Sequence, residues 1–336
     1  MSAEMSTAAA ASGKAGQSGK DKVIVILGPT ASGKTALSLD LAERLGTEII
    51  SGDSMLVYKG FDIGTAKPTL EERRGIRHHL IDILEPAQVY SVTQFQQQAG
   101  TIIRELNAEG RIPIIAGGTG LYLKALLEDY TFNETGEHQA FREEMRAFCE
   151  REGREALYAR LVQADPGSAK TIHAHNIPRV IRALEVAYFG GEQISRSRAY
   201  DDGQELAYDA FVVGLAWERP ALYARINRRV DLMMEAGLEQ EVRTLLDAHV
   251  TREMPAMKGI GYKEMAAYLA GEWTREDAID AIKKGTRHFA KRQLTWYRKM
   301  PYIHWYALDD CSEQELFADV LQDLAGFWPK ESNLFT

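Results

Sequence analysis

Short runs of apolar residues alternate with segments of helical periodicity along most of the chain. The first run, Val23–Leu27, is rich in β-branched residues, and apolar residues recur at helical spacing soon after it, in 36–42. Similar runs predict further strands at 47–51, 111–116, 210–215 and 302–305. Buried strands that alternate with helices are typical of a parallel sheet covered on both faces. We therefore expect an α/β fold with a parallel sheet flanked by helices.

The alternation stops between about 130 and 200, where only helical patterns occur. Consecutive helices are predicted at 141–150, 155–164 and 177–189. The strand pattern then resumes, and further helices are predicted at 222–236, 237–246, 262–269 and 275–298. We expect an all-helical domain at 130–199 that is inserted into a discontinuous core formed by 22–129 and 200–330.

The composition is typical of a globular protein of about two domains. The chain has 336 residues, 45% of them hydrophobic, and no run of about 18 uncharged apolar residues that would predict a membrane span. Its two cysteines, Cys149 and Cys311, are far apart, which argues against a disulfide framework or a zinc site and favours the cytoplasm. Residues 1–21 are small and polar and predict a disordered tail. We expect a monomer.

A glycine-rich loop between the first strand and the first helix carries the strongest chemical signal. The segment Gly28-Pro29-Thr30-Ala31-Ser32-Gly33-Lys34-Thr35 ends in Gly-Lys-Thr, the pattern of a phosphate-binding P-loop. Backbone N–H groups of such a loop converge on a phosphate, the lysine adds a cation, and the Thr35 hydroxyl can hold Mg²⁺. The loop predicts a P-loop NTPase-like sheet. Which phosphate compound it binds stays open at this point.

Polar and small residues follow two other predicted strands and should share an edge with this loop. Asp53 follows the second strand, where it can act as a general base, hold a magnesium ion indirectly by binding one of its ligands, or merely cap the next turn through its own backbone. Gly117-Gly118-Thr119-Gly120 follows the third strand but lacks the spacing of a dinucleotide site. His78 and His79 are adjacent, so their side chains should point to opposite faces of a strand, and we interpret them as structural.

A basic segment with interleaved aromatic residues lies near the C-terminus. Between 281 and 306 there are seven Lys and Arg residues, no acidic residue, and the rings of Phe289, Trp296 and Tyr297 among others. Such a mixture suits phosphate contacts and base stacking. It is equally typical of an amphipathic helix with core aromatics and solvated charges. The net charge of −8 argues against non-specific coating of nucleic acid but leaves a local basic surface possible.

Taken in order, these motifs resemble the bacterial tRNA dimethylallyltransferase family. The resemblance runs from about 23 to 305 and rests on 28–35, 53–68, 117–119, 182–186, 261–264 and 291–296. It implies transfer of a dimethylallyl group from dimethylallyl pyrophosphate to N6 of adenosine 37 in tRNAs that read codons beginning with U. The phosphate loop would then hold pyrophosphate with Mg²⁺ on Thr35, the matching Asp53 would be the base, and Arg229 would bind pyrophosphate with Lys34. Arg225, one helical turn earlier, is a second candidate for the same anion.

The resemblance also implies contacts with the tRNA anticodon stem-loop, whose target base must be flipped out of its stack. The implied contact positions are Asp53, Ser54, Met55, Leu56, Thr119, Arg142, Pro178, Arg179, Val180, Ile181, Arg182, Lys258, Lys263, Lys291 and Arg292. The helical insertion would grip the stem.

Three alternatives remain. An adenylate isopentenyltransferase would use the same donor with a free nucleotide, a P-loop small-molecule kinase would bind ATP, and an RNA-binding chaperone would keep only the fold. The helical insertion and the 291–296 region argue against the adenylate isopentenyltransferase, because a free nucleotide needs no grip on an anticodon stem. The intact Lys34, Thr35 and Asp53 set argues against the chaperone.

Overall fold

The computed structural model describes residues 19–130, 138–190 and 205–336. The chain divides into two compact units, one formed by Met1–Glu128 with Leu206–Thr336 and the other by Asp129–Glu205. The tail predicted for 1–21 lies outside the described residues as far as residue 18. Within the described part of the chain, no helix is long and apolar enough to cross a membrane.

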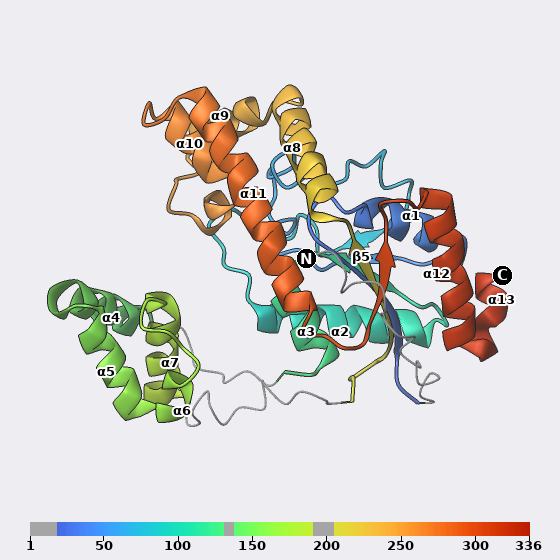
Figure 1. Ribbon diagram of the computed structural model, residues 1–336, viewed down its shortest axis with the longest axis horizontal. Helices are drawn as coiled ribbons and strands as arrows, with labels where there is room; N and C mark the ends of the chain where they lie inside the picture. Colours follow the sequence, from blue (N-terminus) through green and yellow to red (C-terminus); the bar gives the residue numbers. More distant parts are fainter. Residues whose placement is uncertain (1–18, 131–137, 191–204) are drawn as a thin grey trace. The chain divides into compact units, whose positions relative to one another are not determined.

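The first unit is built on a six-stranded sheet in which every pair of neighbouring strands is parallel (Figure 1). The strand order is β3-β2-β4-β1-β5-β6. The strands are β1 (Lys22–Leu27), β2 (Ile49–Ser51), β3 (His78–His79), β4 (Ile114–Gly117), β5 (Asp209–Ala216) and β6 (Ile303–Ala307). The predicted α/β class is therefore confirmed, and all five predicted strands are present. The third strand begins later than expected, at Ile114, directly after Pro113, which has no N–H to donate to a neighbouring strand.

Side chains of β1 alternate between two apolar cores, one on each face of the sheet. Ile24 and Ile26 point into a core shared with helices α1 (Lys34–Leu45), α12 (Glu313–Phe327) and α13 (Ser332–Phe335). Val23 and Val25 point into the opposite core. This alternation is the period of two expected for a strand that is covered on both sides.

The opposite core is covered by helices from widely separated parts of the sequence. They are α2 (Val92–Ala108), α3 (Gly120–Leu127), α8 (Arg219–Glu235), α9 (Leu238–Asp247), the 3₁₀ turn η2 (Pro255–Lys258), α10 (Tyr262–Leu269) and α11 (Arg275–Tyr297). Helix α11 packs against α3, α8 and α10. It therefore brings the basic C-terminal segment next to the strands of the sheet.

Among the longer helices, α2, α3 and α12 were not predicted, although α2 and α12 each begin with a clear capping signal. The Ser91 side chain accepts a hydrogen bond from the backbone N–H of Gln94, and the Gln94 side-chain oxygen accepts one from the backbone N–H of Ser91. Ser312 and Glu315 form the same reciprocal arrangement at the start of α12. Such capping boxes satisfy backbone donors that the first turn of a helix leaves free.

All regular elements in the described part of the second unit are helices. They are α4 (Gln139–Glu152), α5 (Arg154–Ala164), α6 (Pro166–Ala169) and α7 (Ile177–Phe189). Met145, Leu157, Leu161 and Leu184 form their common apolar core. This unit covers the stretch in which the sequence lacks a strand pattern.

Candidate active site

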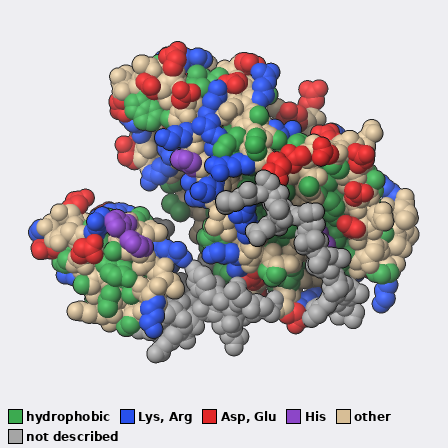
Figure 2. Space-filling view, viewed as in Figure 1, with side chains coloured by type: hydrophobic (Ala, Val, Ile, Leu, Met, Phe, Trp, Pro, Cys, Tyr) green, Lys and Arg blue, Asp and Glu red, His purple; other side chains and the backbone are tan. Residues whose placement is uncertain are grey.

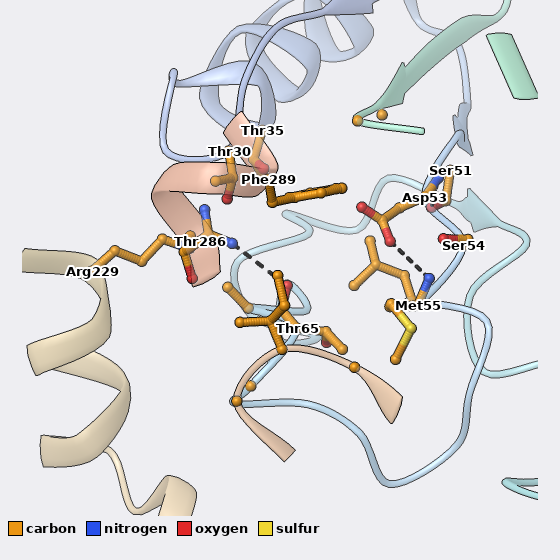
Figure 3. Close-up of a pocket in the computed structure, with 18 of the residues that line it drawn as sticks. Thr30, Thr35, Ser51, Asp53, Ser54, Met55, Thr65, Arg229, Thr286 and Phe289 are labelled. Carbon is orange, nitrogen blue, oxygen red and sulfur yellow. Dashed lines mark hydrogen bonds between the residues drawn. The ribbon is translucent and has the colours of Figure 1, made fainter. Parts of the chain in front are cut away.

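A cavity of about 420 Å³ opens at the carboxyl ends of β1, β2 and β4, inside the first unit (Figure 3). Its walls come from the loop after β1, the Asp53–Leu56 segment after β2, the Gly117-Gly118 turn after β4, and the inner faces of α8 and α11. This edge is where open α/β sheets bind ligands. The size is that of a small-molecule site.

The phosphate loop is shaped by residues with left-handed backbone conformations. Gly33 has a φ of 100° and Ala31 a φ of 65°. These turns bring the loop directly into α1, whose first residue is Lys34 and whose N-terminus has no side-chain cap. The first N–H groups of a helix lack intrahelical acceptors, so an uncapped N-terminus is suited to an anion. Thr30, Lys34 and Thr35 line the cavity.

Lys34 is partly buried beneath this loop. Its Nζ donates to the carbonyl oxygens of Gly28 at 3.0 Å and Pro29 at 2.9 Å. Burial lowers the pKa of Lys34 to about 7, with a further contribution from the positive charge of Arg229, while Asp53 acts in the opposite direction. A lysine with such a pKa changes charge near neutral pH, so an arriving anion can strongly favour its protonated form.

Asp53 lies in the cavity wall and shapes its own loop. Its Oδ1 accepts a hydrogen bond from the N–H of Met55 at 2.8 Å, so the turn-capping role considered from the sequence is present (Figure 3). The neighbouring Ser54 donates its N–H to Oγ1 of Thr119 at 3.1 Å. Thr119 therefore holds the Asp53 loop through this hydrogen bond but does not itself line the cavity.

The two arginines predicted to bind pyrophosphate occupy different environments. Arg229 extends from α8 into the cavity, from the side opposite Asp53, and its Nη2 donates to the carbonyl of Thr65 at 3.5 Å (Figure 3). Burial lowers the pKa of Arg229, and the charge of Asp53 opposes this effect. Arg225 does not line the cavity. Its guanidinium carbon lies 4.4 Å from the ring centre of Trp217, and its Nε donates to the carbonyl of Ala31 at 2.9 Å.

Helix α11 contributes both an inner and an outer face. Thr286, Phe289 and Arg292 line the cavity on the inner side. Lys291 is exposed and does not line it. Figure 2 shows Lys and Arg side chains gathered on the surface over this helix. Tyr297 is a core residue while most of the charges face solvent, as expected for an amphipathic helix, and contact of these charges with nucleic acid stays a prediction.

Sequence reasoning did not select two α11 residues that contact the loops directly. Gln293 and Tyr297 are both buried and hydrogen-bonded to backbone atoms of the glycine-rich turns. They are four positions apart and share a helix face with Phe289, and Gln293 also lies in the 291–296 motif, so these two signals could have singled them out.

Of the implied RNA contacts in the first unit, six line the cavity together with Asp53: Ser54, Met55, Leu56, Lys258, Lys263 and Arg292. In the second unit, Val180 and Ile181 are buried in the apolar core, so their side chains cannot face an RNA. The expectation narrows there to Pro178 and Arg179, which are exposed, and to Arg142 and Arg182. Both of the latter bind the fully buried Glu185, at 2.9 Å and 2.7 Å.

The residues present fit a phosphate-bound Mg²⁺ better than a metal held by protein alone. Among the described residues there is no group of three or more His, Cys, Asp and Glu side chains that could hold a metal. The oxygen ligands Thr35, Ser51 and Asp53 line the same cavity. Mg²⁺ usually keeps several waters and uses few protein ligands together with substrate phosphates, so this sparse set suits it.

Comparisons with known proteins agree with this geometry. The family model described as IPP transferase matches residues 56–300. The tRNA dimethylallyltransferase of Bacillus subtilis (strain 168) is 46% identical over 88% of this chain and 94% of its own, and that of Geobacillus kaustophilus (strain HTA426) is 47% identical over 91% and 96%.

Solved structures give the same picture. The full-length tRNA isopentenylpyrophosphate transferase of Bacillus halodurans is 42% identical, with a TM-score of 0.70 over 94% of this chain and 99% of its own. A eukaryotic dimethylallyltransferase acting on tRNA is 30% identical, with a TM-score of 0.76 over 91% of this chain and 78% of its own.

Proposed function

The chain belongs to the IPP transferase family, and we propose that it transfers a dimethylallyl group from dimethylallyl pyrophosphate to N6 of adenosine 37 in tRNAs that read codons beginning with U. One observation carries this proposal. The cavity joins a phosphate loop, the cations Lys34 and Arg229, and the carboxylate of Asp53. Groups that can stabilise a leaving anion and a carboxylate that can accept a proton thus line the same cavity.

The donor's pyrophosphate would lie on the phosphate loop. The free N–H groups at the start of α1, with Lys34 and Arg229, would stabilise the negative charge that grows on this leaving group. Bound Mg²⁺ would supply further positive charge to the phosphate oxygens, and the Thr35 hydroxyl is the protein ligand best placed to hold it. The five-carbon group would contact apolar wall residues such as Ile226, Val230 and Phe289.

The transfer would break the bond between the allylic carbon and the pyrophosphate oxygen and form a bond from that carbon to N6. Pyrophosphate leaves with the electron pair of the broken bond. The attacking amine loses a proton, which Asp53 accepts. Since Oδ1 of Asp53 already accepts from Met55, the loop holds the carboxylate in one orientation before the substrate arrives.

The acceptor tRNA would reach this centre with its target base flipped out of the anticodon loop. The basic surface over α11 would contact its phosphates, and Arg179 and Arg182 of the second unit would contact the stem. Because all cavity residues come from one chain, the proposal needs only a monomer. A tRNA substrate also favours a cytoplasmic enzyme.

Incubation with labelled dimethylallyl pyrophosphate and Mg²⁺, and either unmodified tRNA or AMP, tests the proposal. We expect label in tRNA, at N6 of adenosine 37 after nuclease digestion. Label that appears only in AMP would instead identify an adenylate isopentenyltransferase. Phosphate transfer from ATP to a small molecule, without prenyl transfer, would identify a kinase.

A further inference from the structure

The loops after β1 and β4 leave the sheet toward opposite faces. The β1 loop leads into α1, which packs in the core containing Ile24 and Ile26, whereas the β4 turn leads into α3, which packs in the other core. Since β1 and β4 are neighbours, a crevice forms between their carboxyl ends. Anything that fills this crevice controls the distance between the phosphate loop and the Gly118 turn.

Two side chains of α11, Gln293 and Tyr297, fill this crevice and form a hydrogen-bonded bridge between the two loops. The Tyr297 hydroxyl lies 2.9 Å from the carbonyl oxygen of Gly118 and 3.3 Å from that of Gly28, within hydrogen-bond range of both loops. The Gln293 amide uses both of its ends: Oε1 accepts from the N–H of Thr30 at 2.9 Å, and Nε2 donates to the carbonyl of Gly118 at 2.8 Å. Gln293 is only 4% exposed.

The bridge extends to the Asp53 loop. Thr119, the residue after Gly118, donates its N–H to the carbonyl of Gly52 at 3.2 Å and accepts the N–H of Ser54 at 3.1 Å. A continuous path of hydrogen bonds and covalent links therefore runs from Thr30 in the phosphate loop, through Gln293, to the loop that carries Asp53.

Gly118 leaves just enough room for this bridge. A Cβ built at Gly118 would lie 2.4 Å from Nε2 of Gln293, closer than any real contact. A side chain at this position would therefore push the Gln293 amide out of place without removing it.

We propose that Gln293 and Tyr297 are positioning residues that hold the pyrophosphate loop and the Asp53 loop at a fixed separation, so that the leaving group and the base act on the same bound pair of substrates. This inference rests on the proposed function. Neither residue needs to touch a substrate. Their effect comes through the orientation of the Thr30 amide and of the Gly118 turn, and a small misplacement of such groups lowers rates strongly.

The test compares Gln293→Leu and Tyr297→Phe with Tyr122→Phe in the full chain. Tyr122 is also buried and donates its hydroxyl to a backbone carbonyl, that of Tyr90 at 3.0 Å, but it is absent from the cavity and the crevice. Loss of the Tyr122 hydroxyl in Tyr122→Phe is therefore a matched structural control. Three quantities are measured: the melting temperature, the Kd for inorganic pyrophosphate with Mg²⁺ by calorimetry, and the single-turnover rate of prenyl transfer to tRNA at saturating donor.

We expect all three variants to lower the melting temperature, because each loses buried hydrogen bonds. Only the crevice variants should raise the pyrophosphate Kd, by about tenfold for Gln293→Leu, and also lower the single-turnover rate by at least about tenfold. An unchanged Kd and rate in Gln293→Leu, or equal changes in Tyr122→Phe, would overturn the inference.

Gly118→Ala provides a second test that keeps the glutamine. We expect it to weaken pyrophosphate binding as Gln293→Leu does. The double variant Gly118→Ala/Gln293→Ala should bind pyrophosphate no more weakly than Gln293→Ala alone, because the amide that the new Cβ would clash with is gone. Additive losses would overturn the inference. If the wild type binds pyrophosphate but prenylates no tRNA, the proposed function fails. The pyrophosphate Kd values of the variants then still test whether Gln293 and Tyr297 position the loops. A wild type that binds no pyrophosphate would refute both.

Discussion

Arg225 and Arg229 lie one turn apart on α8, yet only Arg229 reaches the cavity, while Arg225 stacks on Trp217 and holds the carbonyl of Ala31 from outside. Trp217 adds a second bond to the same loop, from its Nε1 to the carbonyl of Ser32 at 3.2 Å. Two consecutive carbonyls of the phosphate loop are thus fixed on its outer side. The α8 helix therefore contributes Arg229 to the cavity and Arg225 to the outer side of the phosphate loop.

This difference predicts separate phenotypes for the two arginines. Arg229→Ala should raise the Kd for pyrophosphate by about 100-fold, since a charge-assisted contact in a buried site is lost. Arg225→Ala should lower the melting temperature and raise that Kd by less than about tenfold. Calorimetric titration of both variants with pyrophosphate checks the order. A larger loss of affinity in Arg225→Ala would mean that its side chain turns into the cavity when the anion binds.

Lys34 should make pyrophosphate binding dependent on pH. Because its pKa is about 7 in the folded protein, the side chain is largely neutral above that pH, and a bound anion must draw in a proton to charge it. We expect affinity to fall as pH rises from 7 to 9, with proton uptake on binding. Calorimetry in buffers of different ionisation enthalpy measures this uptake directly. Lys34→Met should bind weakly at every pH and show little uptake, and an equal uptake in that variant would assign the proton to another group.

The same lysine affects stability, and the sign follows from linkage. Its pKa is 10.5 in the unfolded reference state and about 7 in the folded state, so between these values the unfolded chain binds more protons. The contribution of Lys34 to stability should therefore rise with pH across this window. Urea unfolding of wild type and Lys34→Met at pH 7 and 9 checks it, and the difference between the two proteins should grow in favour of the wild type.

The substitution Asp53→Asn separates the role of Asp53 as a base from its role in holding the turn at Met55. An asparagine keeps an oxygen that can accept from the Met55 N–H, so the loop retains its shape. The single-turnover rate of prenyl transfer should fall by at least about 10²-fold, because no group accepts the N6 proton. Binding of tRNA should be nearly unchanged. A normal rate in this variant would remove Asp53 from the base role.

The parts of the site that could be predicted are those encoded locally. The phosphate loop and Asp53 follow apolar strands in sequence, and strand ends of a parallel sheet meet at one edge, so their proximity follows from the pattern. Gln293 could not be predicted in the same way. Its partners Thr30 and Gly118 are distant in sequence, and only the packing of α11 against α3 brings them together.

Glu241 is another long-range contact that the sequence does not reveal. Its carboxylate accepts the backbone N–H groups of Asp62 at 3.1 Å and Ile63 at 2.8 Å, and the hydroxyl of Tyr262 at 2.6 Å. The loop it holds leads to Thr65, whose carbonyl accepts from Arg229. The orientation of Arg229 therefore depends on α9.

Glu241→Gln should destabilise the protein by about 1–3 kcal/mol, because the amide can accept fewer of these hydrogen bonds. The Kd for pyrophosphate should rise through the displaced Thr65 carbonyl. Glu239→Gln on the same helix is the control. The ion pairs of Glu239 with Arg243 and Arg275 lie near the surface, so their loss should cost less than about 1 kcal/mol. Urea unfolding of the two variants decides, and equal losses would refute a special role for Glu241.

In the second unit, Glu185 binds two of the three arginines implied in tRNA contact, Arg142 and Arg182. It is fully buried, accepts from Arg142 and Arg182, and also accepts the N–H of His138 at 3.2 Å. Burial opposes ionisation, but the hydrogen bonds from Arg182 and Arg142 outweigh it and hold the pKa of Glu185 below its ordinary value. Its stabilising contribution is therefore complete above the unfolded pKa of 4.5 and is lost as pH falls through the lower folded pKa.

Glu185→Gln should loosen this unit, because removal of one charge leaves two arginines without their buried partner. Hydrogen exchange followed by mass spectrometry on the full chain should show faster exchange in α4 and α7, with unchanged exchange in α1 and α11. The affinity for tRNA should fall, since Arg142 and Arg182 lose their fixed orientation, while the Kd for pyrophosphate stays that of the wild type. Glu143→Gln, at an exposed position of α4 whose carboxylate accepts a hydrogen bond from the Gln139 side chain, is the control and should leave exchange and both affinities unchanged. If Glu185→Gln weakened pyrophosphate binding as strongly as tRNA binding, the assignment of donor binding to the first unit and of tRNA-stem binding to the second unit would be wrong.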